Sequence, residues 1–170
     1  MKLGKQVYSK IIIIGSPGAG KSYFARELSE KTGLPLFHMD NIYWKADKTH
    51  ISREELSKKI AVIMENDEWI IDGNYVSTLE QRVQAAQMVI FMDCPTWQCL
   101  DGIRKRCGTQ RSDMPWVESK PDEEFVEFVK KFKAETKPVI EEILDWYPEK
   151  TKLIFKTRKD AANWLLKECD

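Results

Sequence analysis

Eight consecutive residues near the start of the chain have the types and spacing needed to bind a row of phosphates. The stretch from Gly15 to Ser22 fits the pattern G-x-x-x-x-G-K-[S/T]. Its glycines let successive backbone N–H groups converge on an anion, because no Cβ blocks the approach. In such a loop the lysine reaches the β- and γ-phosphates and the hydroxyl binds Mg²⁺, which predicts these roles for Lys21 and Ser22. The predicted ATP site comprises Gly15, Ser16, Pro17, Gly18, Ala19, Gly20, Lys21, Ser22 and Tyr23.

Other reactive side chains follow short apolar runs farther along the chain. Asp72 ends the run that begins at Trp69, where a carboxylate can hold Mg²⁺ through its waters; the alternative is a carboxylate that caps the next turn. Asn74, two residues later, is predicted to contact an acceptor. Asp93 ends a similar run but is followed by Pro95, so we interpret it as structural.

A second polar and aromatic segment runs from His38 to Trp44. Asp40 is predicted to orient or deprotonate an acceptor hydroxyl, or to help hold the metal, and it shares a face of an extended chain with His38. Tyr43 and Trp44 are predicted to form a stacking wall for the acceptor. The alternative is that both rings belong to the core and that Asp40 forms a turn.

Arginines form a third candidate group. Arg104 and Arg111 lie before and within a polar segment that is longer than a usual connection, and mobile arginines can clamp the moving phosphoryl group. We predict that both are catalytic and that Arg104 also contacts ATP. Arg106 fits a solvated basic face better. Arg82 either reaches the acceptor or is an exposed charge.

These residues need a scaffold, and the sequence predicts alternating strands and helices. The all-apolar run that ends at Ile14 is typical of a strand buried on both faces, and helical spacing follows the phosphate loop. Ser52 and Thr157 have the pattern of helix caps. Two helical stretches are predicted between Asp122 and Trp146, interrupted near Pro138. The alternation predicts a parallel sheet covered by helices on both faces, with ligands at the carboxyl ends of its strands.

Bulk properties narrow the choice further. The chain has 170 residues, which predicts one domain spanning residues 1–170. Its 27 basic and 27 acidic residues balance, which argues against direct contact with DNA, and no apolar run is long enough to span a membrane. Reduced thiols are predicted for Cys94, Cys99, Cys107 and Cys169, and the expected location is cytoplasmic.

Four motifs together resemble one family, the small adenylate-kinase-like P-loop proteins known as DNA topology modulation proteins. These motifs are the phosphate loop, H-x-D-x-x-Y-W from His38, W-I-I-D-G-N-Y from Trp69 and R-S-D-M-P-W from Arg111. The resemblance implies a three-layer P-loop NTPase fold of the nucleoside-monophosphate-kinase type. It further implies a five-stranded parallel sheet in the order 2-3-1-4-5, an acceptor-binding helical region at about 39–66 and a helical lid at about 107–121.

The chain departs from adenylate kinases where those enzymes carry T-G-D-M-L-R and D-G-F-P-R, so the arginines that grip AMP are missing from their usual places. Asp40 instead resembles the acceptor carboxylate of shikimate-type kinases. The leading hypothesis is a kinase that uses Mg·ATP and phosphorylates a nucleoside monophosphate or a hydroxylated metabolite. The alternatives are an ATP-binding regulator linked to DNA topology and a GTPase-like switch, and the absence of an N/T-K-x-D motif argues against the switch.

Overall fold

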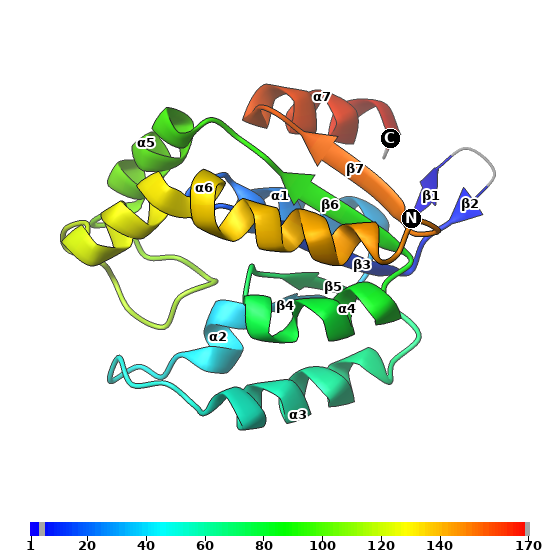
Figure 1. Cartoon of the computed structure of the whole chain (residues 1–170), viewed down its shortest axis with the longest axis horizontal. Coiled ribbons are helices and arrows are strands. Elements are labelled where there is room, and N and C mark those ends of the chain that lie inside the picture. The colour runs from blue at the N-terminus through cyan, green and yellow to red at the C-terminus, as the bar shows by residue number, and fades with distance from the viewer. Residues whose placement is uncertain (4–5, 169–170) are drawn as a thin grey trace.

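The computed structural model describes residues 1–3 and 6–168 and shows the expected α/β architecture (Figure 1). Five parallel strands form the central sheet: β3 (Lys10–Gly15), β4 (Leu36–His38), β5 (Trp69–Asp72), β6 (Met88–Met92) and β7 (Thr151–Phe155). Their order across the sheet is β4-β5-β3-β6-β7, which is 2-3-1-4-5 when these five strands are counted along the chain. The labels run ahead of that count because a short antiparallel pair, β1 (Lys2–Leu3) and β2 (Gln6–Val7), precedes the sheet and was not predicted.

The central strand β3 shows why the sheet needs helices on both faces. Its four isoleucines are all fully buried. Because side chains alternate along a strand, Ile11 and Ile13 pack into one core cluster while Ile12 and Ile14 pack into another. A run without alternation in polarity is therefore the expected sequence of a strand in the middle layer.

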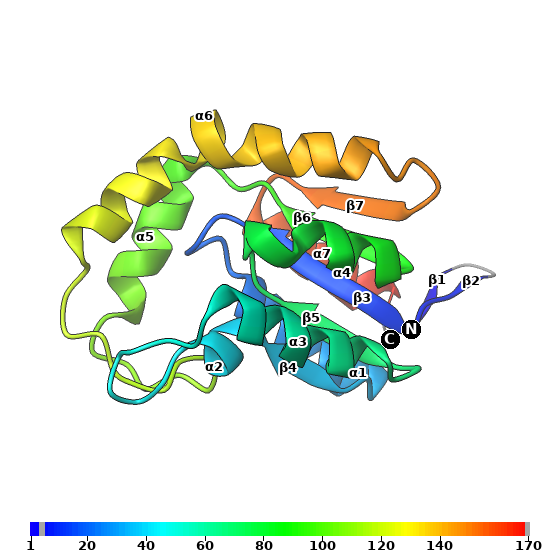
Figure 2. The ribbon, with the colours of Figure 1, turned by 60° about the horizontal axis from the view of Figure 1, so that its bottom comes forward.

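Helices α1 (Lys21–Thr32) and α7 (Arg158–Glu168) cover one face of the sheet. The other face is covered by α3 (Arg53–Met64), α4 (Leu79–Ala85) and α6 (Glu123–Asp145), as the turned view in Figure 2 shows. The short elements α2 (Met39–Tyr43), η1 (Val76–Thr78) and α5 (Thr96–Arg106) lead away from the ends of β4, β5 and β6. The predicted caps are confirmed, since Ser52 Oγ accepts the N–H of Glu55 and Thr157 Oγ1 accepts the N–H of Asp160.

Two predictions about the second half of the chain are wrong. Pro138 does not interrupt the helical region, because α6 is one helix of 23 residues that contains it. The proline costs the hydrogen bond to the carbonyl of Ala134, but both residues are exposed, so water can satisfy that carbonyl. Buried residues on both sides, such as Phe132 and Ile140, keep the helix against the sheet.

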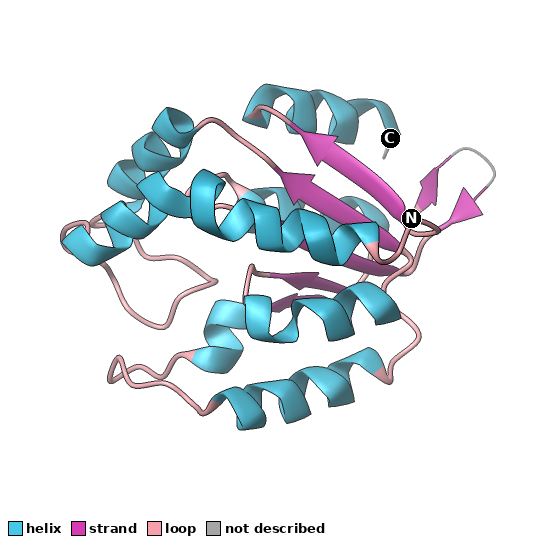
Figure 3. Cartoon of the chain, viewed as in Figure 1, coloured by secondary structure: helices cyan, strands magenta, loops and turns pink. Residues whose placement is uncertain are grey.

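The predicted lid is also not helical. The segment between α5 and α6, residues 107–122, consists of turns and bends (Figure 3). It lies beside the loop that joins α2 to α3 (Figure 2), and Trp116 contacts Trp44 across the gap at 5.5 Å between ring centroids. We call residues 107–122 the arginine loop.

No helix among the described residues is long and apolar enough to cross a membrane. Cys94 and Cys99 are buried free thiols and Cys107 is a half-buried one, which confirms the prediction for these three. Cys169 lies outside the described residues.

Candidate functional site

A single cleft of 1510 Å³ brings together the phosphate loop, α2, the turn after β5 and the arginine loop. It lies at the carboxyl ends of the parallel strands, where ligands bind in open α/β sheets. Most of the predicted site residues line it: Pro17, Gly18, Gly20, Lys21, Ser22, Tyr23, His38, Asp40, Tyr43, Trp44, Asp72, Asn74 and Arg111. The remaining loop residues, Gly15, Ser16 and Ala19, belong to the continuous turn between β3 and α1.

The backbone of the phosphate loop requires its glycines. Gly18 adopts φ 77°, and a Cβ there would lie 2.1 Å from the carbonyl oxygen of Cys99 in α5. Gly15 adopts φ 140°, with a Cβ position 2.5 Å from Met92 O. Gly20 precedes α1 without a side-chain cap from the described residues, so the first N–H groups of that helix remain available to an anion.

Lys21 lies in the first turn of α1 and bends back over the loop. Its Nζ donates to the carbonyl oxygen of Ser16 at 3.1 Å, inside the turn that the loop wraps. A cation held against the backbone of the phosphate loop is suited to a phosphate chain.

Arg158, at the start of α7, is a neighbour of the loop that sequence reasoning missed. Its Nη2 donates to the carbonyl oxygens of Gly18 at 2.6 Å and Gln98 at 2.7 Å, and it lines the cleft. These two hydrogen bonds link the phosphate loop to α5, and the guanidinium group of Arg158 adds a positive charge beside the loop. The sequence feature that could have identified Arg158 is its position shortly after the last strand, at the same edge of the sheet as the other site residues.

The ends of β4 and β5 place a histidine against a buried carboxylate. The strands pair in register at His38 and Asp72, so the two side chains emerge side by side, and His38 Nδ1 lies 2.9 Å from Asp72 Oδ2. The other oxygen, Asp72 Oδ1, is buried without a hydrogen-bond partner among the described residues. An unpartnered buried carboxylate oxygen is a suitable ligand for a hard cation or its water.

Asp40 does not lie in an extended segment, contrary to the prediction from the sequence. It lies in the first turn of α2, so it does not share a strand face with His38, and that prediction is wrong. Tyr75 donates its hydroxyl hydrogen to Asp40 Oδ1 at 2.6 Å. Burial raises the pKa of Asp40, helped by the charge of Asp72, although the Tyr75 hydrogen bond acts in the opposite direction. A carboxylate with a raised pKa is better matched to accepting a proton near neutral pH.

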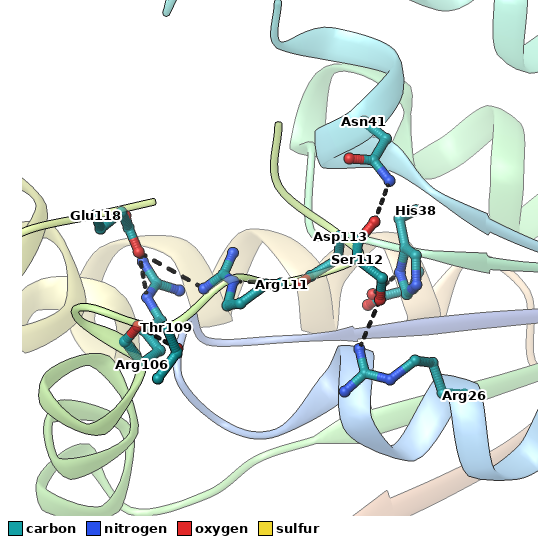
Figure 4. A network of polar contacts seen from close by, with 10 residues as sticks. Arg26, His38, Asn41, Arg106, Thr109, Arg111, Ser112, Asp113 and Glu118 are labelled. Carbon is teal, nitrogen blue, oxygen red and sulfur yellow. Dashed lines mark hydrogen bonds and ion pairs between the residues drawn. The ribbon is translucent and has the colours of Figure 1, made fainter. Parts of the chain in front are cut away.

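The arginine loop crosses the cleft and is held at both sides (Figure 4). Asn41 in α2 donates to the carbonyl oxygen of Ser112 at 2.7 Å, and Arg26 in α1 donates to its hydroxyl at 3.4 Å. Asp113, which sequence reasoning missed, lies beside the phosphate loop. Burial acts to raise the pKa of Asp113, but its hydrogen bond with Ser22 and the charge of Arg111 lower it overall.

Of the predicted arginines, only Arg111 enters the cleft as expected. Its Nε lies 3.3 Å from Asp113 Oδ1 and its Nη1 lies 3.6 Å from Glu118 Oε2, while Nη2 is buried without a partner among the described residues. Arg104 is exposed and does not line the cleft, so the structure does not support its predicted contact with ATP. Arg106, two residues later on α5, faces the cleft instead and pairs with Glu118 at 2.8 Å.

Arg82 does not line the cleft, and it is not an exposed charge either. It is fully buried in α4 and donates to the carbonyl oxygens of Gly73 at 2.8 Å and Tyr75 at 2.9 Å. Burial lowers its pKa to about 9, partly offset by the charge of Asp72. Arg82 therefore holds the turn that carries Asn74 and Tyr75. Asn74 Oδ1 in turn accepts the N–H of Gly15 at 3.4 Å.

Comparisons with known proteins agree with this architecture. The adenylate kinase of Thermotoga neapolitana is 33% identical over 92 residues, which cover 54% of this chain and 38% of that protein. The match thus spans well under half the length of that curated relative. No family model matches the chain.

Two solved structures share the fold over nearly the whole chain. Shikimate kinase from Acinetobacter baumannii, in complex with shikimate, has a TM-score of 0.65 at 13% identity and covers 95% of this chain and 90% of its own. Deoxyadenosine kinase from M. mycoides, with bound dCMP and dCDP, has a TM-score of 0.53 at 17% identity and covers 92% and 94%. The chain thus shares the fold of these solved kinases and carries a phosphate-loop sequence motif between β3 and α1. The narrower resemblance to DNA topology modulation proteins stays a prediction.

Proposed function

We propose that this protein transfers the γ-phosphoryl group of Mg·ATP to a hydroxyl group of a small acceptor. The observation that carries the proposal is that four groups converge in one cleft: a glycine-rich phosphate-loop motif, a buried carboxylate oxygen of Asp72, an acid with a raised pKa and the arginine Arg111. The Asp72 oxygen and one nitrogen of Arg111 have no hydrogen-bond partner among the described residues. These are the parts that phosphoryl transfer uses, because the enzyme must position two substrates and neutralise charge on the moving group. The adenylate kinase similarity supports the same class of reaction.

Each group then has a role in the reaction. The loop amides and Lys21 bind the phosphate chain, and Arg111 stabilises charge on the transferred group. The acceptor oxygen bonds to the γ-phosphorus as the bond to the β–γ bridging oxygen breaks, so ADP leaves. Asp40 accepts the hydroxyl proton, and the products are ADP, a phosphate monoester and one proton.

Ser22 and Asp72 would hold Mg²⁺, which supplies charge neutralisation at the β- and γ-phosphates when bound. The oxygen donors fit this ion, and Asp72 Oδ1 is free of protein partners among the described residues. The described residues contain no group of three or more acidic, histidine or cysteine side chains that could hold a metal ion by themselves. This is compatible with Mg²⁺, which takes most of its ligands from water and substrate phosphates.

The test is a panel of acceptors assayed for ADP release and for a product that gains one phosphoryl group. AMP, shikimate and deoxyadenosine represent three classes of acceptor. We expect at least one acceptor to be phosphorylated faster than ATP is hydrolysed without it, and Lys21→Ala to remove ATP binding in a calorimetric titration. Lys58→Ala is the matched control, because Lys58 is exposed on α3, where it pairs with Glu54, and it does not line the cleft. Unchanged ATP affinity in Lys21→Ala would refute the proposed role of the loop.

A further inference from the structure

Five aromatic rings lie close together near Asp40, on the side of the cleft formed by α2 and the arginine loop. Tyr43 stacks on His50 with centroids 4.7 Å apart, and it meets Trp44 and Tyr75 edge-on at 5.0 Å each. Trp44 meets Trp116 of the arginine loop at 5.5 Å and 88°. We call Tyr43, Trp44, His50, Tyr75 and Trp116 the aromatic cluster. Its members come from three segments that are distant in the sequence: residues 43–50, Tyr75 and Trp116.

The cluster is more than a part of the hydrophobic core. All of its members are half-buried or exposed, and four of them, Tyr43, Trp44, Tyr75 and Trp116, line the cleft. Trp44 and Trp116 belong to neither of the two core clusters. Indole rings that remain in contact with a large cleft offer surface on which a flat ligand can stack.

The aromatic cluster adjoins the proposed base directly. Tyr75 belongs to the cluster and also donates the 2.6 Å hydrogen bond to Asp40. Tyr75 is therefore the one side chain that separates a ligand stacked on the aromatic cluster from Asp40, the carboxylate that accepts the hydroxyl proton. The acceptor needs a flat part and a hydroxyl group a short distance away from it.

The charges of the cleft disfavour an acceptor that already carries a phosphate group. Three buried or half-buried carboxylates, Asp40, Asp72 and Asp113, lie near one another. The arginines that line the cleft already contact protein groups: Arg26 with Ser112, Arg106 with Glu118, Arg111 with Asp113 and Arg158 with Gly18. The nitrogen of Arg111 that lacks a partner among the described residues is assigned above to the transferred phosphoryl group. Lys48, Lys105 and Lys120 also line the cleft, but all three are exposed, so water and salt screen their charges. A phosphomonoester with about −1.5 to −2 charge would then lack a buried counter-charge of its own.

We propose that the acceptor is an uncharged, flat heteroaromatic alcohol that stacks on the aromatic cluster and presents its hydroxyl group to Asp40. Nucleosides are the biological class that combines a planar base with a hydroxyl on a short sugar arm. This inference rests on the proposed phosphoryl transfer and specifies its acceptor. The phosphoryl group moves from ATP to the sugar hydroxyl, with ADP and one proton as the other products.

Calorimetric titration of the intact protein tests acceptor recognition without turnover. The probes are adenosine, thymidine, their 5′-monophosphates and shikimate, each added in the presence of a non-hydrolysable Mg·ATP analogue. We expect a nucleoside to bind at least tenfold more tightly than its own monophosphate and than shikimate. Trp44→Ala and Trp116→Ala should each weaken that binding by about 5- to 150-fold, the usual effect of losing one base–aromatic stack.

Matched variants separate stacking from damage to the fold. Trp97→Ala removes an indole that is 69% exposed and does not line the cleft, and it should leave nucleoside binding unchanged. Trp44→Phe should restore most of the affinity lost in Trp44→Ala. All variants should bind the ATP analogue as the unmodified protein does, which verifies that the site is folded.

The outcomes distinguish this inference from the proposed function. If ATP binds and a monophosphate or shikimate binds more tightly than every nucleoside, the acceptor inference is wrong while the kinase proposal stands. If nucleoside affinity is the same in Trp44→Ala and Trp97→Ala, the aromatic cluster is not the acceptor site. If neither ATP nor its analogue binds, the proposed function itself fails.

Discussion

The phosphate end of the cleft is one continuous stretch of backbone, whereas the acceptor end is assembled from side chains that are distant in the sequence. Between β3 and α1, the groups proposed to bind phosphate are mostly backbone amides, whose positions follow from glycine φ angles and from the start of a helix. At the other end, Asp40, Tyr75 and Trp116 come from α2, the turn after β5 and the arginine loop. The first kind of site tolerates few changes in its own sequence and the second depends on how separate elements pack.

The two ends of the cleft also differ in the charges that they carry. The phosphate end carries Lys21 and Arg158, both bonded to loop carbonyls, and the dipole of α1. The acceptor end carries the half-buried carboxylate of Asp40 and the aromatic cluster. A cleft that is positive at one end and acidic at the other orients an anionic donor and a neutral acceptor without further recognition.

The largest expected effect separates the two arginines that sequence reasoning treated alike. Arg111→Ala should lower kcat by about 10³- to 10⁵-fold, because an arginine on the transferred group stabilises charge that develops only in the transition state. Arg104→Ala should change kcat by less than about twofold, since Arg104 is exposed and does not line the cleft. Steady-state phosphoryl transfer measures both. Equal losses in the two variants would contradict this distinction, because Arg104 would then act on the transferred group as well.

Removal of the proposed base should affect the acceptor end alone. Asp40→Asn should lower kcat by about 10²- to 10⁴-fold through loss of proton transfer. Affinity for an ATP analogue should stay unchanged in calorimetry, because Asp40 does not belong to the phosphate loop. A comparable loss of ATP affinity would mean that the two ends are not separable.

Arg82 connects the two ends through the turn that it holds. Arg82→Met should destabilise the protein by about 1 to 3 kcal/mol, because it leaves the buried carbonyl oxygens of Gly73 and Tyr75 without a donor. Urea unfolding measures the loss. In the folded fraction, acceptor KM should rise more than ATP KM, since Tyr75 contacts Asp40 directly. A loss of stability with unchanged KM values would restrict Arg82 to a structural role.

The smallest expected effect is a shift in pH dependence. Tyr75→Phe removes a hydrogen bond that lowers the pKa of Asp40, so that pKa should rise. Because the base works when deprotonated, activity increases as pH rises through this pKa, and the acidic limb of the kcat/KM profile should move to higher pH. A shift of about one unit corresponds to tenfold lower activity on that limb. An acidic limb that stays in place would argue that another group titrates there.

Much of the phosphate end could be predicted because its information is local. The apolar run before Gly15, the glycines and Lys21 lie within a dozen residues, and each acts through backbone conformation. The strand–loop–helix order and the parallel sheet followed from the same kind of local pattern. The aromatic pair Tyr43 and Trp44 was predicted for the acceptor wall, but its partner Trp116 was not, because no local pattern connects residues so far apart.

The amino-acid sequence by itself determined the glycine-rich loop between β3 and α1, the α/β alternation and the edge of the sheet where Asp72 and Asp40 would lie, because spacing and residue type decide these features within a few turns of chain. Tertiary structure alone decided which arginine faces the cleft, that Arg82 is buried against carbonyls, and that His38 is bonded to Asp72. Those outcomes depend on strand register and helix rotation, which are set by the packing of the whole core rather than by neighbours in sequence.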